Sequence, residues 1–253
     1  HIYYTSNSAG TWSAPVDISG SDTALNIARM AVGGDDHLHV VWPDNRTGTP
    51  MVYYTENDGT GWLAAQAISS PSLDAGPADI AVDLNNKPHG VLPGQGATAQ
   101  VYYSNYDVDV AGDWSSPLNI SNSTSDCSWP RIGIDSSGNI YVSYWEDDAG
   151  ELEVFIAEYV NASAWLTPVN ISQTAGVDSD HSELAVEPDG TIHCVWREDG
   201  HVLLYRVREN GTWRAAQTVS SEAVSIEYPR LGLAPDGAVY VGWQWVYSAV
   251  PKY

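Results

Sequence analysis

The stretch VYYTENDGTGWLAAQAIS, residues 52–69, contains the pattern that decides the fold. It reads as a Tyr-rich strand, a turn of Gly and Asn, a Trp, and a second strand that ends at Ser. Four other segments repeat the pattern: IYYTSNSAGTWSAPVDIS (2–19), VYYSNYDVDVAGDWSSPLNIS (101–121), VFIAEYVNASAWLTPVNIS (154–172) and LLYRVRENGTWRAAQTVS (203–220). The chain is therefore predicted to contain five copies of one β unit of about 50 residues.

Five further hairpins alternate with these segments. Each is a short apolar strand, a turn rich in Asp, Asn and Gly, and a second strand, as in ARMAVGGDDHLHVVWPD (28–44) and PRIGIDSSGNIYVSYWED (130–147). Gly supplies the positive φ that such turns need, and no stretch has sustained helical periodicity. With strands A and B in these hairpins and C and D in the Tyr-rich segments, each unit has four strands. We predict one all-β domain over residues 1–253, a five-bladed β-propeller with four-stranded antiparallel blades.

The two ends of the chain are expected to close the ring. The chain begins with a C–D hairpin and ends with an A–B hairpin, and neither is a blade alone. Pairing residues 229–245 with residues 1–19 completes a fifth blade and removes an open seam. The other blades are expected at about 27–69, 78–121, 130–172 and 181–220. A fragment of a larger propeller is the alternative.

The C–D turns resemble the Asp box, or BNR repeat, of the sialidase-like propeller superfamily, whose motif is Ser/Thr-x-Asp-x-Gly-x-Thr-Trp. This chain has SNSAGTW (6–12), TENDGTGW (55–62) and RENGTW (208–213), in which Gly and Trp are kept and Asp mostly is not. In that family the box is structural and lies opposite the functional face, so the resemblance implies a fold and not sialidase activity. Five blades are also similar to tachylectin-type lectins and to furanosidase and arabinanase families, whereas sialidases have six.

The net charge and the aromatic content indicate which classes of molecule the protein can bind. The net charge is -22, with Lys+Arg 10 against Asp+Glu 32, and such a surface repels nucleic acid and anionic lipid. No apolar run reaches the ~18 residues that a membrane helix needs. The many aromatic residues, Trp 11 and Tyr 15, suit strands and sugar-binding surfaces equally. We expect a monomer that binds a glycan or a protein, with no nucleic acid and no membrane insertion.

An extracellular or cell-surface location follows from the fold and from six sequons, although the repeat itself also explains their number: Asn45, Asn119, Asn122, Asn161, Asn170 and Asn210. The two cysteines, Cys127 and Cys194, have no CxxC spacing. Cys194 lies in a predicted strand, which favours a buried hydrophobe, and one disulfide is the alternative.

Aligning the repeats places one charged residue near the start of every A strand. We call these five the inner charged positions: Arg29, Asp79, Arg131, Glu183 and Arg230. Charges at a narrow centre are costly unless paired, so one interpretation is a set of Arg–carboxylate pairs that holds the blades in register. The other is a clamp for an anion or a sugar acid. For a hydrolase, Asp79 and Glu183 would be the acid and base, with Arg131 between them.

Two other aligned sets lie in the B strands. The first is His39, His89, Tyr141, His193 and Tyr240, for which packing with a hydrogen-bonding tip is favoured over metal binding. The second is Trp42, Leu92, Tyr144, Trp196 and Trp243, which is expected to pack between blades.

The residues after strand B are expected on the upper face, where aromatic rings beside carboxylates suit sugars. These candidate ligand-binding residues are Asp44, Trp145, Glu146, Arg197, Glu198 and Trp245. The acidic run at Asp147 and Asp148 could hold calcium, although it matches no defined loop.

The sequence favours an extracellular, non-catalytic, lectin-like propeller whose ligand binds on the upper face. A glycoside hydrolase of sialidase-like or five-bladed furanosidase type is the alternative, and a structural domain of a larger surface protein is the second. There is no nucleophile elbow, P-loop, dinucleotide fingerprint or HExxH motif, so no cofactor other than calcium is expected.

Overall fold

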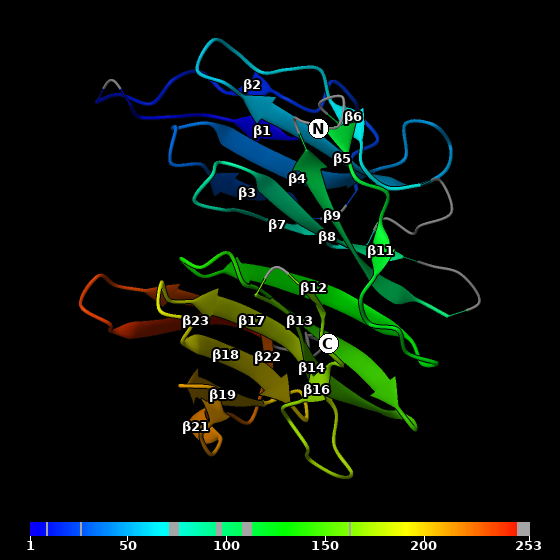
Figure 1. Cartoon of the computed structure of the whole chain (residues 1–253), viewed down its shortest axis with the longest axis vertical. Helices are drawn as coiled ribbons and strands as arrows, with labels where there is room; N and C mark the ends of the chain where they lie inside the picture. The colour runs from blue at the N-terminus through cyan, green and yellow to red at the C-terminus, as the bar shows by residue number, and fades with distance from the viewer. Residues whose placement is uncertain are drawn as a thin grey trace, which may run out of the picture. The chain divides into compact units, whose positions relative to one another are not determined.

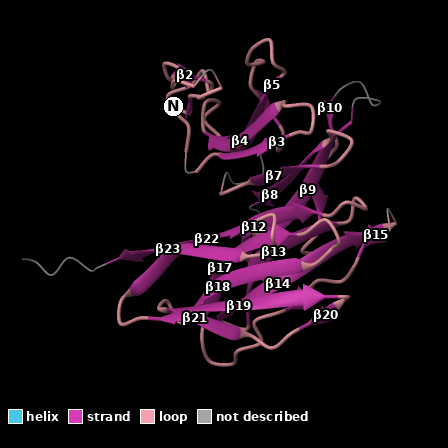
Figure 2. Ribbon diagram, turned by 90° about the vertical axis from the view of Figure 1, so that its left-hand side faces the viewer, coloured by secondary structure: helices cyan, strands magenta, loops and turns pink. Residues whose placement is uncertain are grey.

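The chain folds into antiparallel β-sheets. Its structure, a computed structural model, describes residues 1–8, 10–25, 27–70, 76–94, 98–107, 113–161 and 163–246. These residues form strands and loops with no helix (Figure 1, Figure 2). The chain divides into two units, His1–Asn122 and Ser123–Tyr253. The all-β prediction is therefore confirmed for the described part of the chain.

Unit 1 contains three sheets. In the first, β1 (Tyr3–Tyr4) pairs with β2 (Val16–Asp17). The second has four strands in chain order: β3 (Arg29–Val32), β4 (Leu38–Asp44), β5 (Met51–Asn57) and β6 (Gln66–Ala67). The third repeats this order with β7 (Asp79–Val82), β8 (Pro88–Gly94), β9 (Gln100–Asp107) and β10 (Asp113–Trp114), and β11 (Leu118–Asn119) also pairs with β9.

Unit 2 also contains three sheets. The first consists of β12 (Cys127–Ile134), β13 (Ile140–Asp148), β14 (Glu151–Val160) and β15 (Ala164–Trp165), with β16 (Val169–Asn170) on β14. The second consists of β17 (Ser179–Val186), β18 (Ile192–Glu198), β19 (Val202–Glu209) and β20 (Thr212–Trp213), with β21 (Gln217–Ser221) on β19. In the third, β22 (Ser225–Leu233) pairs with β23 (Val239–Val246).

Apolar side chains fill the spaces between neighbouring sheets of each unit. In unit 1, Trp42 packs with Met51 and Tyr53, and in unit 2, Trp196 packs with Tyr141 and Val154. Trp42, Leu92, Tyr144 and Trp196 have no exposed surface, and Trp243 packs on the cluster of Val195, Leu203 and Ile226. Packing between neighbouring sheets is thus confirmed for Trp42, Leu92, Trp196 and Trp243, whereas the ring of Tyr144 stacks on Phe155 of its own sheet.

The aligned histidines pack within their own sheets. In each case a ring nitrogen, Nδ1, shares a hydrogen bond with a Tyr hydroxyl on the next strand. The pairs are His39–Tyr54 at 2.8 Å, His89–Tyr103 at 2.6 Å and His193–Tyr205 at 2.7 Å. The packing interpretation is therefore confirmed. Both cysteines are free and buried, as expected for buried hydrophobes.

The predicted closing blade is not one sheet in the described residues. The hairpin β1–β2 and the hairpin β22–β23 each form a separate two-stranded sheet. Local sequence patterns fix hairpins, whereas closure depends on pairing between strands more than 200 residues apart, which no local pattern dictates. The structure therefore shows four-stranded antiparallel sheets of the expected kind, without a closed set of five.

Candidate functional site

The inner charged positions occupy one register position in their sheets. Arg29 and Asp79 face Val41 and Val91 in unit 1. In unit 2 the corresponding pairs are Arg131–Ser143, Glu183–Val195 and Arg230–Gly242. The sequence alignment of these five residues is therefore correct, whatever their role.

In unit 2, one carboxylate pairs with two arginines from different sheets. Arg131 Nε and Arg230 Nη1 both donate to Glu183 Oε2, each at 3.1 Å. Only 2% of Arg131 is exposed, so its charge needs the partner that Glu183 provides. These contacts connect strands β12, β17 and β22 in the manner of the pairing interpretation.

Two residues before each of these positions, unit 2 has an aromatic side chain. Trp129, His181 and Tyr228 form what we call the aromatic cluster. The ring centroids of Trp129 and His181 are 4.6 Å apart, those of His181 and Tyr228 are 6.0 Å apart, and those of Trp129 and Tyr228 are 6.3 Å apart. The Arg131 guanidinium lies 5.9 Å from the Trp129 ring centroid. The rings therefore meet beside the paired charges.

A β-bulge places each ring of the aromatic cluster. The register shifts between Ser128 and Arg131, and in the same way on β17 and β22. The cluster residues have φ of 57° (Trp129), 47° (His181) and 48° (Tyr228). A bulky residue at positive φ is strained, at a cost of about 1–3 kcal/mol. Such bulges redirect side chains and are common beside functional sites, and this one occurs three times.

Beside the aromatic cluster lies an ionic group of Asp180, Arg197 and Glu227. Arg197 donates to both carboxyl oxygens of Asp180 at 2.7 Å and 2.5 Å, and its Nη1 donates to Glu227 Oε1 at 2.6 Å. His181 Nδ1 lies 3.0 Å from Asp180 Oδ1, and its Nε2 lies 3.8 Å from Glu227 Oε2. Burial raises the pKa of Asp180, but the interactions with His181 and Arg197 outweigh it and hold that pKa below its ordinary value. Arg197 is thereby fixed between two carboxylates.

The carboxylates at the ends of the B strands bind their own loops. Asp44 accepts hydrogen bonds from Thr23, Trp42 and Arg46, and these overcome burial to lower the pKa of Asp44 to about 2. Glu146 accepts from the Ser123 hydroxyl at 2.7 Å.

Glu198 does the same in the next sheet, where it accepts a hydrogen bond from the Thr174 hydroxyl at 2.9 Å. Three of the predicted ligand-binding residues therefore hold the incoming loop against the end of strand B.

The remaining predicted residues belong neither to the aromatic cluster nor to its ionic group, although Trp145 faces the residue next to Trp129. Trp145 is partly buried opposite Ser128, and Trp245 is 47% exposed opposite Ile226. Asp147 Oδ1 accepts from the Gly150 amide at 2.8 Å, and Asp148 is exposed. Within the described residues, no group of three His, Cys, Asp or Glu side chains is placed to hold a metal.

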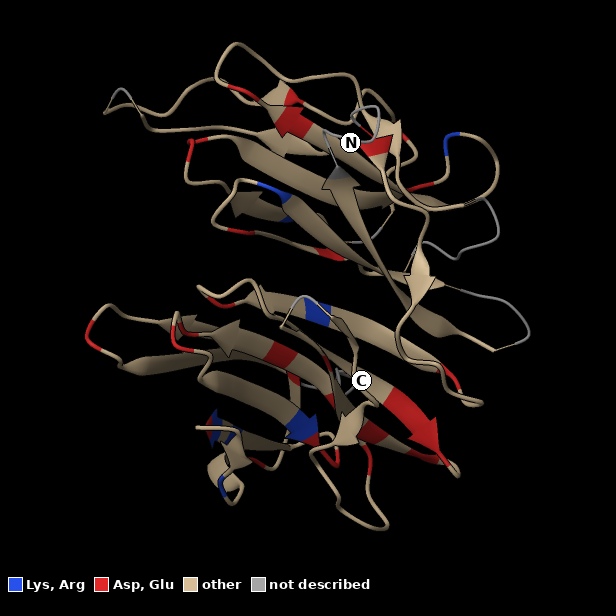
Figure 3. Ribbon diagram, in the orientation of Figure 1, with Lys and Arg blue, Asp and Glu red and all other residues tan. Residues whose placement is uncertain are grey.

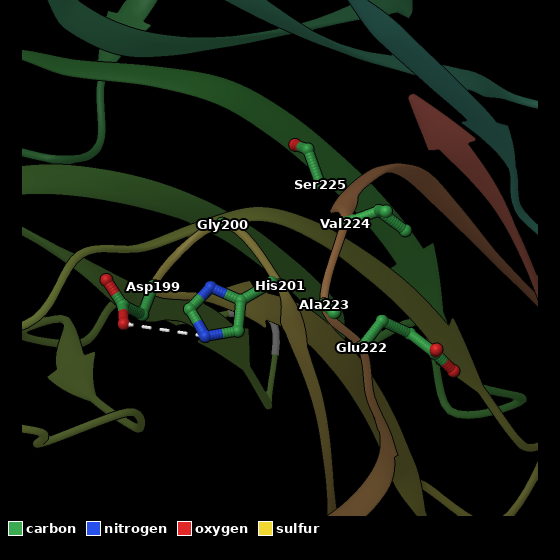
Figure 4. Close-up of a pocket in the computed structure, with 7 residues that line it drawn as sticks. All are labelled: Asp199, Gly200, His201, Glu222, Ala223, Val224 and Ser225. Atoms are coloured by element: carbon green, nitrogen blue, oxygen red, sulfur yellow. Dashed lines mark ion pairs between the residues drawn. The ribbon is translucent and has the colours of Figure 1, made fainter. Parts of the chain in front are cut away.

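A hollow of about 300 Å³ lies in unit 2 between the β18–β19 turn and the loop that leads into β22. Figure 4 shows residues 199–201 facing residues 222–225 across it. Ser225 lines the hollow, and its hydroxyl donates to Glu227 Oε1 at 3.1 Å. The hollow and the ionic group beside the aromatic cluster therefore share one carboxylate.

The aromatic cluster is the main feature that the sequence predictions omitted. Its signal is present in the aligned repeats, because an aromatic residue precedes the inner charged position by two residues in three successive repeats. The corresponding residues in unit 1 are Ile27 and Pro77. Alignment on the charged residues alone did not reveal the rings.

No protein-family model and no curated protein matches the sequence. Its fold is similar to that of a protein of unknown function from Dyadobacter fermentans, with a TM-score of 0.66 and 10% identity over 87% of this chain and 75% of that one. A Hadza microbial sialidase gives a TM-score of 0.64 and 14% identity over 88% of this chain, which spans only 53% of the sialidase. An endo-arabinase from Bacteroides thetaiotaomicron gives 0.56 and 12%, over 88% and 89%.

These likenesses, at low sequence identity, show the fold alone: the chain folds like propeller proteins that include sialidases, an endo-arabinase and a family-43 glycoside hydrolase. No helix in the described residues is long and apolar enough to cross a membrane.

Proposed function

We propose that the chain is an extracellular carbohydrate-binding propeller whose site is the aromatic cluster with its ionic group. The observation that supports this most is the threefold recurrence of a strained aromatic residue on successive inner strands, at Trp129, His181 and Tyr228. Strain of this kind persists where the surrounding structure imposes it, as in ligand sites. Of Tyr228, 41% is exposed, so part of the cluster is open to a ligand.

The chemistry of the cluster suits a sugar. Aromatic rings offer flat apolar faces to the C–H side of a sugar ring, and carboxylates beside them accept hydrogen bonds from hydroxyls. Asp180 Oδ1 and Glu227 Oε2 lie 3.0 Å and 3.8 Å from the ring nitrogens of His181, so carboxylates and rings lie side by side, with Asp180 itself buried.

The charges favour an uncharged glycan. Arg131, Arg197 and Arg230 are balanced by Asp180, Glu183 and Glu227, and each arginine binds at least one of these carboxylates. A ligand carboxylate would have to compete with these internal pairs, and the chain's net charge of -22 opposes it further. Figure 3 shows the excess of acidic residues along strands and loops of both units.

We also propose that the fold is completed by a fifth blade. Strand β1 has the contacts of a C strand, because Tyr4 packs on Trp62 at 5.0 Å and 70°, as Tyr54 packs on Trp114. Ile2 N donates to Ser19 Oγ, as Val52 N donates to Ser69 Oγ. Strand β1 thus corresponds to a C strand, and β23 to a B strand, which is the pairing that the other blades have.

A glycoside hydrolase is the second candidate, supported by the structural likeness to a sialidase and an endo-arabinase. Its acid and base would be Asp79 and Glu183. Two guanidinium groups donate to Glu183, which favours its role as a counter-ion over that of a proton donor. If Asp79→Asn and Glu183→Gln each abolished a hydrolytic activity on arabino-oligosaccharides, while the fold remained intact, the hydrolase would replace the binding protein.

The test is calorimetric titration with neutral oligosaccharides (arabino-, xylo-, cello- and manno-series) and with matched sialylated and uronate-containing glycans. We expect binding to a neutral series, and a loss of at least about tenfold for Trp129→Ala and Tyr228→Ala, since truncation of a central aromatic contact costs about 2 kcal/mol. Circular dichroism and the melting temperature check that each variant folds.

The exposed Trp245 and the partly buried Trp145, both outside the cluster, provide matched variants. Trp245→Ala and Trp145→Ala should bind as the unchanged chain does. A loss confined to these two variants would move the site to the rim that the sequence predicts. Flat titrations across the whole panel would refute the proposed function.

A further inference from the structure

The hollow beside β22 is placed to extend the carbohydrate site. Its walls are the β18–β19 turn, where Asp199 and Gly200 have positive φ, and residues 222–225, which lead into β22 and include its first residue (Figure 4). Backbone hydrogen bonds fix the two walls to each other: Glu222 N donates to His201 O at 3.0 Å, and Ile226 N donates to Gly200 O at 2.8 Å. The hollow is therefore part of the fold and not a gap between independent loops.

Hydrogen bonds connect the hollow to the ionic group beside the aromatic cluster. Ser225 Oγ donates to Glu227 Oε1, which also accepts from Arg197, and Tyr228 follows Glu227 in the chain. Ser225 and Glu227 are two positions apart on one strand, so their side chains lie on the same side of it. Ser225 and Tyr228 are three positions apart on β22, so their backbones lie no more than about 10 Å apart, a distance that two linked sugars can span.

The lining of the hollow suits hydroxyl groups. Ser225 can donate and accept, Asp199 and Glu222 accept, and His201 can do either according to its tautomer. Its volume of about 300 Å³ is at the lower end of ligand pockets, enough for a single sugar ring. Ala223 and Val224 add apolar surface to these polar groups, but no Trp or Tyr ring is among the lining residues, which indicates a subsite that adds to a stacked sugar and does not bind one alone.

We propose that the hollow is a second subsite, so that the ligand is an uncharged oligosaccharide with one sugar on the aromatic cluster and the next in the hollow. This inference rests on the proposed function, because the first sugar is bound by Trp129, His181 and Tyr228. It adds that affinity depends on the length of the glycan, and that this dependence comes from residues 199–201 and 222–225.

The experiment titrates the neutral series that binds in the panel, at lengths of one to four sugars. For the unchanged chain, we expect the affinity to rise at least about tenfold from one sugar to two or three, which corresponds to one additional set of polar contacts. Ala223→Leu fills the hollow from its exposed lip, so it should abolish that rise and leave the affinity for one sugar unchanged.

Ala215→Leu is the matched control, because Ala215 is exposed in the loop between β20 and β21 and does not line the hollow. It should keep the full dependence on length. The ring signals of His201 in an NMR spectrum give a second readout, and they should shift with a trisaccharide and not with a monosaccharide.

The possible failures of the two proposals can be distinguished. Equal affinity at all lengths, or a dependence on length that Ala223→Leu leaves intact, would overturn the second subsite while binding at the aromatic cluster remains. Absence of binding at every length, or binding that Trp129→Ala does not change, would overturn the proposed function and the subsite with it.

Discussion

The strands that carry the inner charged positions differ between the two units in the residues that come before the charge. In unit 1, β3 and β7 are four residues long and begin at the charged residue, Arg29 or Asp79. In unit 2, β12, β17 and β22 are eight or nine residues long, because each begins ahead of the charged residue and reaches it through a bulge. The extension pairs with the end of the B strand and carries an aromatic residue at positive φ.

This difference shows which features of the repeat a sheet needs in order to fold and which ones occur only at the candidate site. In unit 1 the equivalent residues, Ile27 and Pro77, have no positive φ, and both sheets form nevertheless. The bulges of unit 2 therefore add strain that sheet formation does not require, and they recur where three rings meet beside paired charges. Unit 2 contains the candidate site, whereas unit 1 shows the basic pattern of the repeat.

The largest effect that we expect in unit 2 comes from breaking its charge pairing. Glu183→Gln keeps the volume and removes the charge that Arg131 and Arg230 share. Because Arg131 is 2% exposed, the variant leaves a buried cation unpaired, and we expect the free energy of unfolding to fall by about 3–5 kcal/mol. Urea denaturation followed by tryptophan fluorescence measures it.

Glu209→Gln is the control for that measurement, since its partner Arg214, at 2.9 Å, is exposed on the same unit. Loss of this surface pair should change the free energy of unfolding by less than about 1 kcal/mol. Similar losses in the two variants would mean that the pairing of inner charges contributes no more to stability than a surface contact.

The sequence predicts the sheets well because each depends on local patterns. The Gly/Asn turns, the Tyr-rich strands and the buried residues Trp42 and Trp196 recur at fixed offsets, and hairpins form from residues near one another in the chain. Closure of the predicted ring does not depend on local patterns, because it requires pairing between the two ends of the chain.

The site was less predictable for a physical reason. A carboxylate that binds sugar and one that holds a loop, as Asp44 and Glu198 do, look alike in sequence, because both follow an aromatic residue at the end of a strand. A bulge also changes the direction of a side chain without changing its spacing in the sequence. Trp129 is for this reason displaced from the alternation that the rest of β12 follows.

The stability of the two units should differ in its dependence on pH, with an effect of moderate size. Burial lowers the pKa of His39 and of His89 in unit 1, whereas two of the three equivalent residues in unit 2, Tyr141 and Tyr240, are tyrosines. A histidine with a lowered folded pKa takes up a proton more readily when unfolded, so its stabilising effect is complete above about pH 6.5 and is lost as the pH falls below that value. Unit 1 should therefore become less stable between pH 7.5 and pH 5.

Amide hydrogen exchange at the two pH values measures each unit separately. His39→Gln and His89→Gln should reduce the loss in unit 1. The window stays above the titration of Asp44, whose pKa of about 2 makes its contribution disappear only in stronger acid, below about pH 4. The hydrogen bond with Glu56 raises the pKa of His37, so this histidine stabilises unit 1 more as the pH falls. Its side chain is partly exposed, and its effect on stability is smaller than that of the buried histidines. Equal losses in both units would contradict the assignment to buried histidines.

The smallest effect has an unusual sign and tests the strain directly. Tyr228→Gly removes an exposed ring from a residue with φ of 48°, which glycine adopts without strain. Where φ is not positive the change to glycine costs stability, as we expect for Ile27→Gly at the equivalent position just before β3. At the bulge, relief of strain offsets that cost, so Tyr228→Gly should leave the free energy of unfolding within about 1 kcal/mol or raise it. Its binding to the neutral glycan should nevertheless be lost, as in Tyr228→Ala. A large loss of stability would show that the ring supports the fold, and the bulge would then need no ligand to explain it.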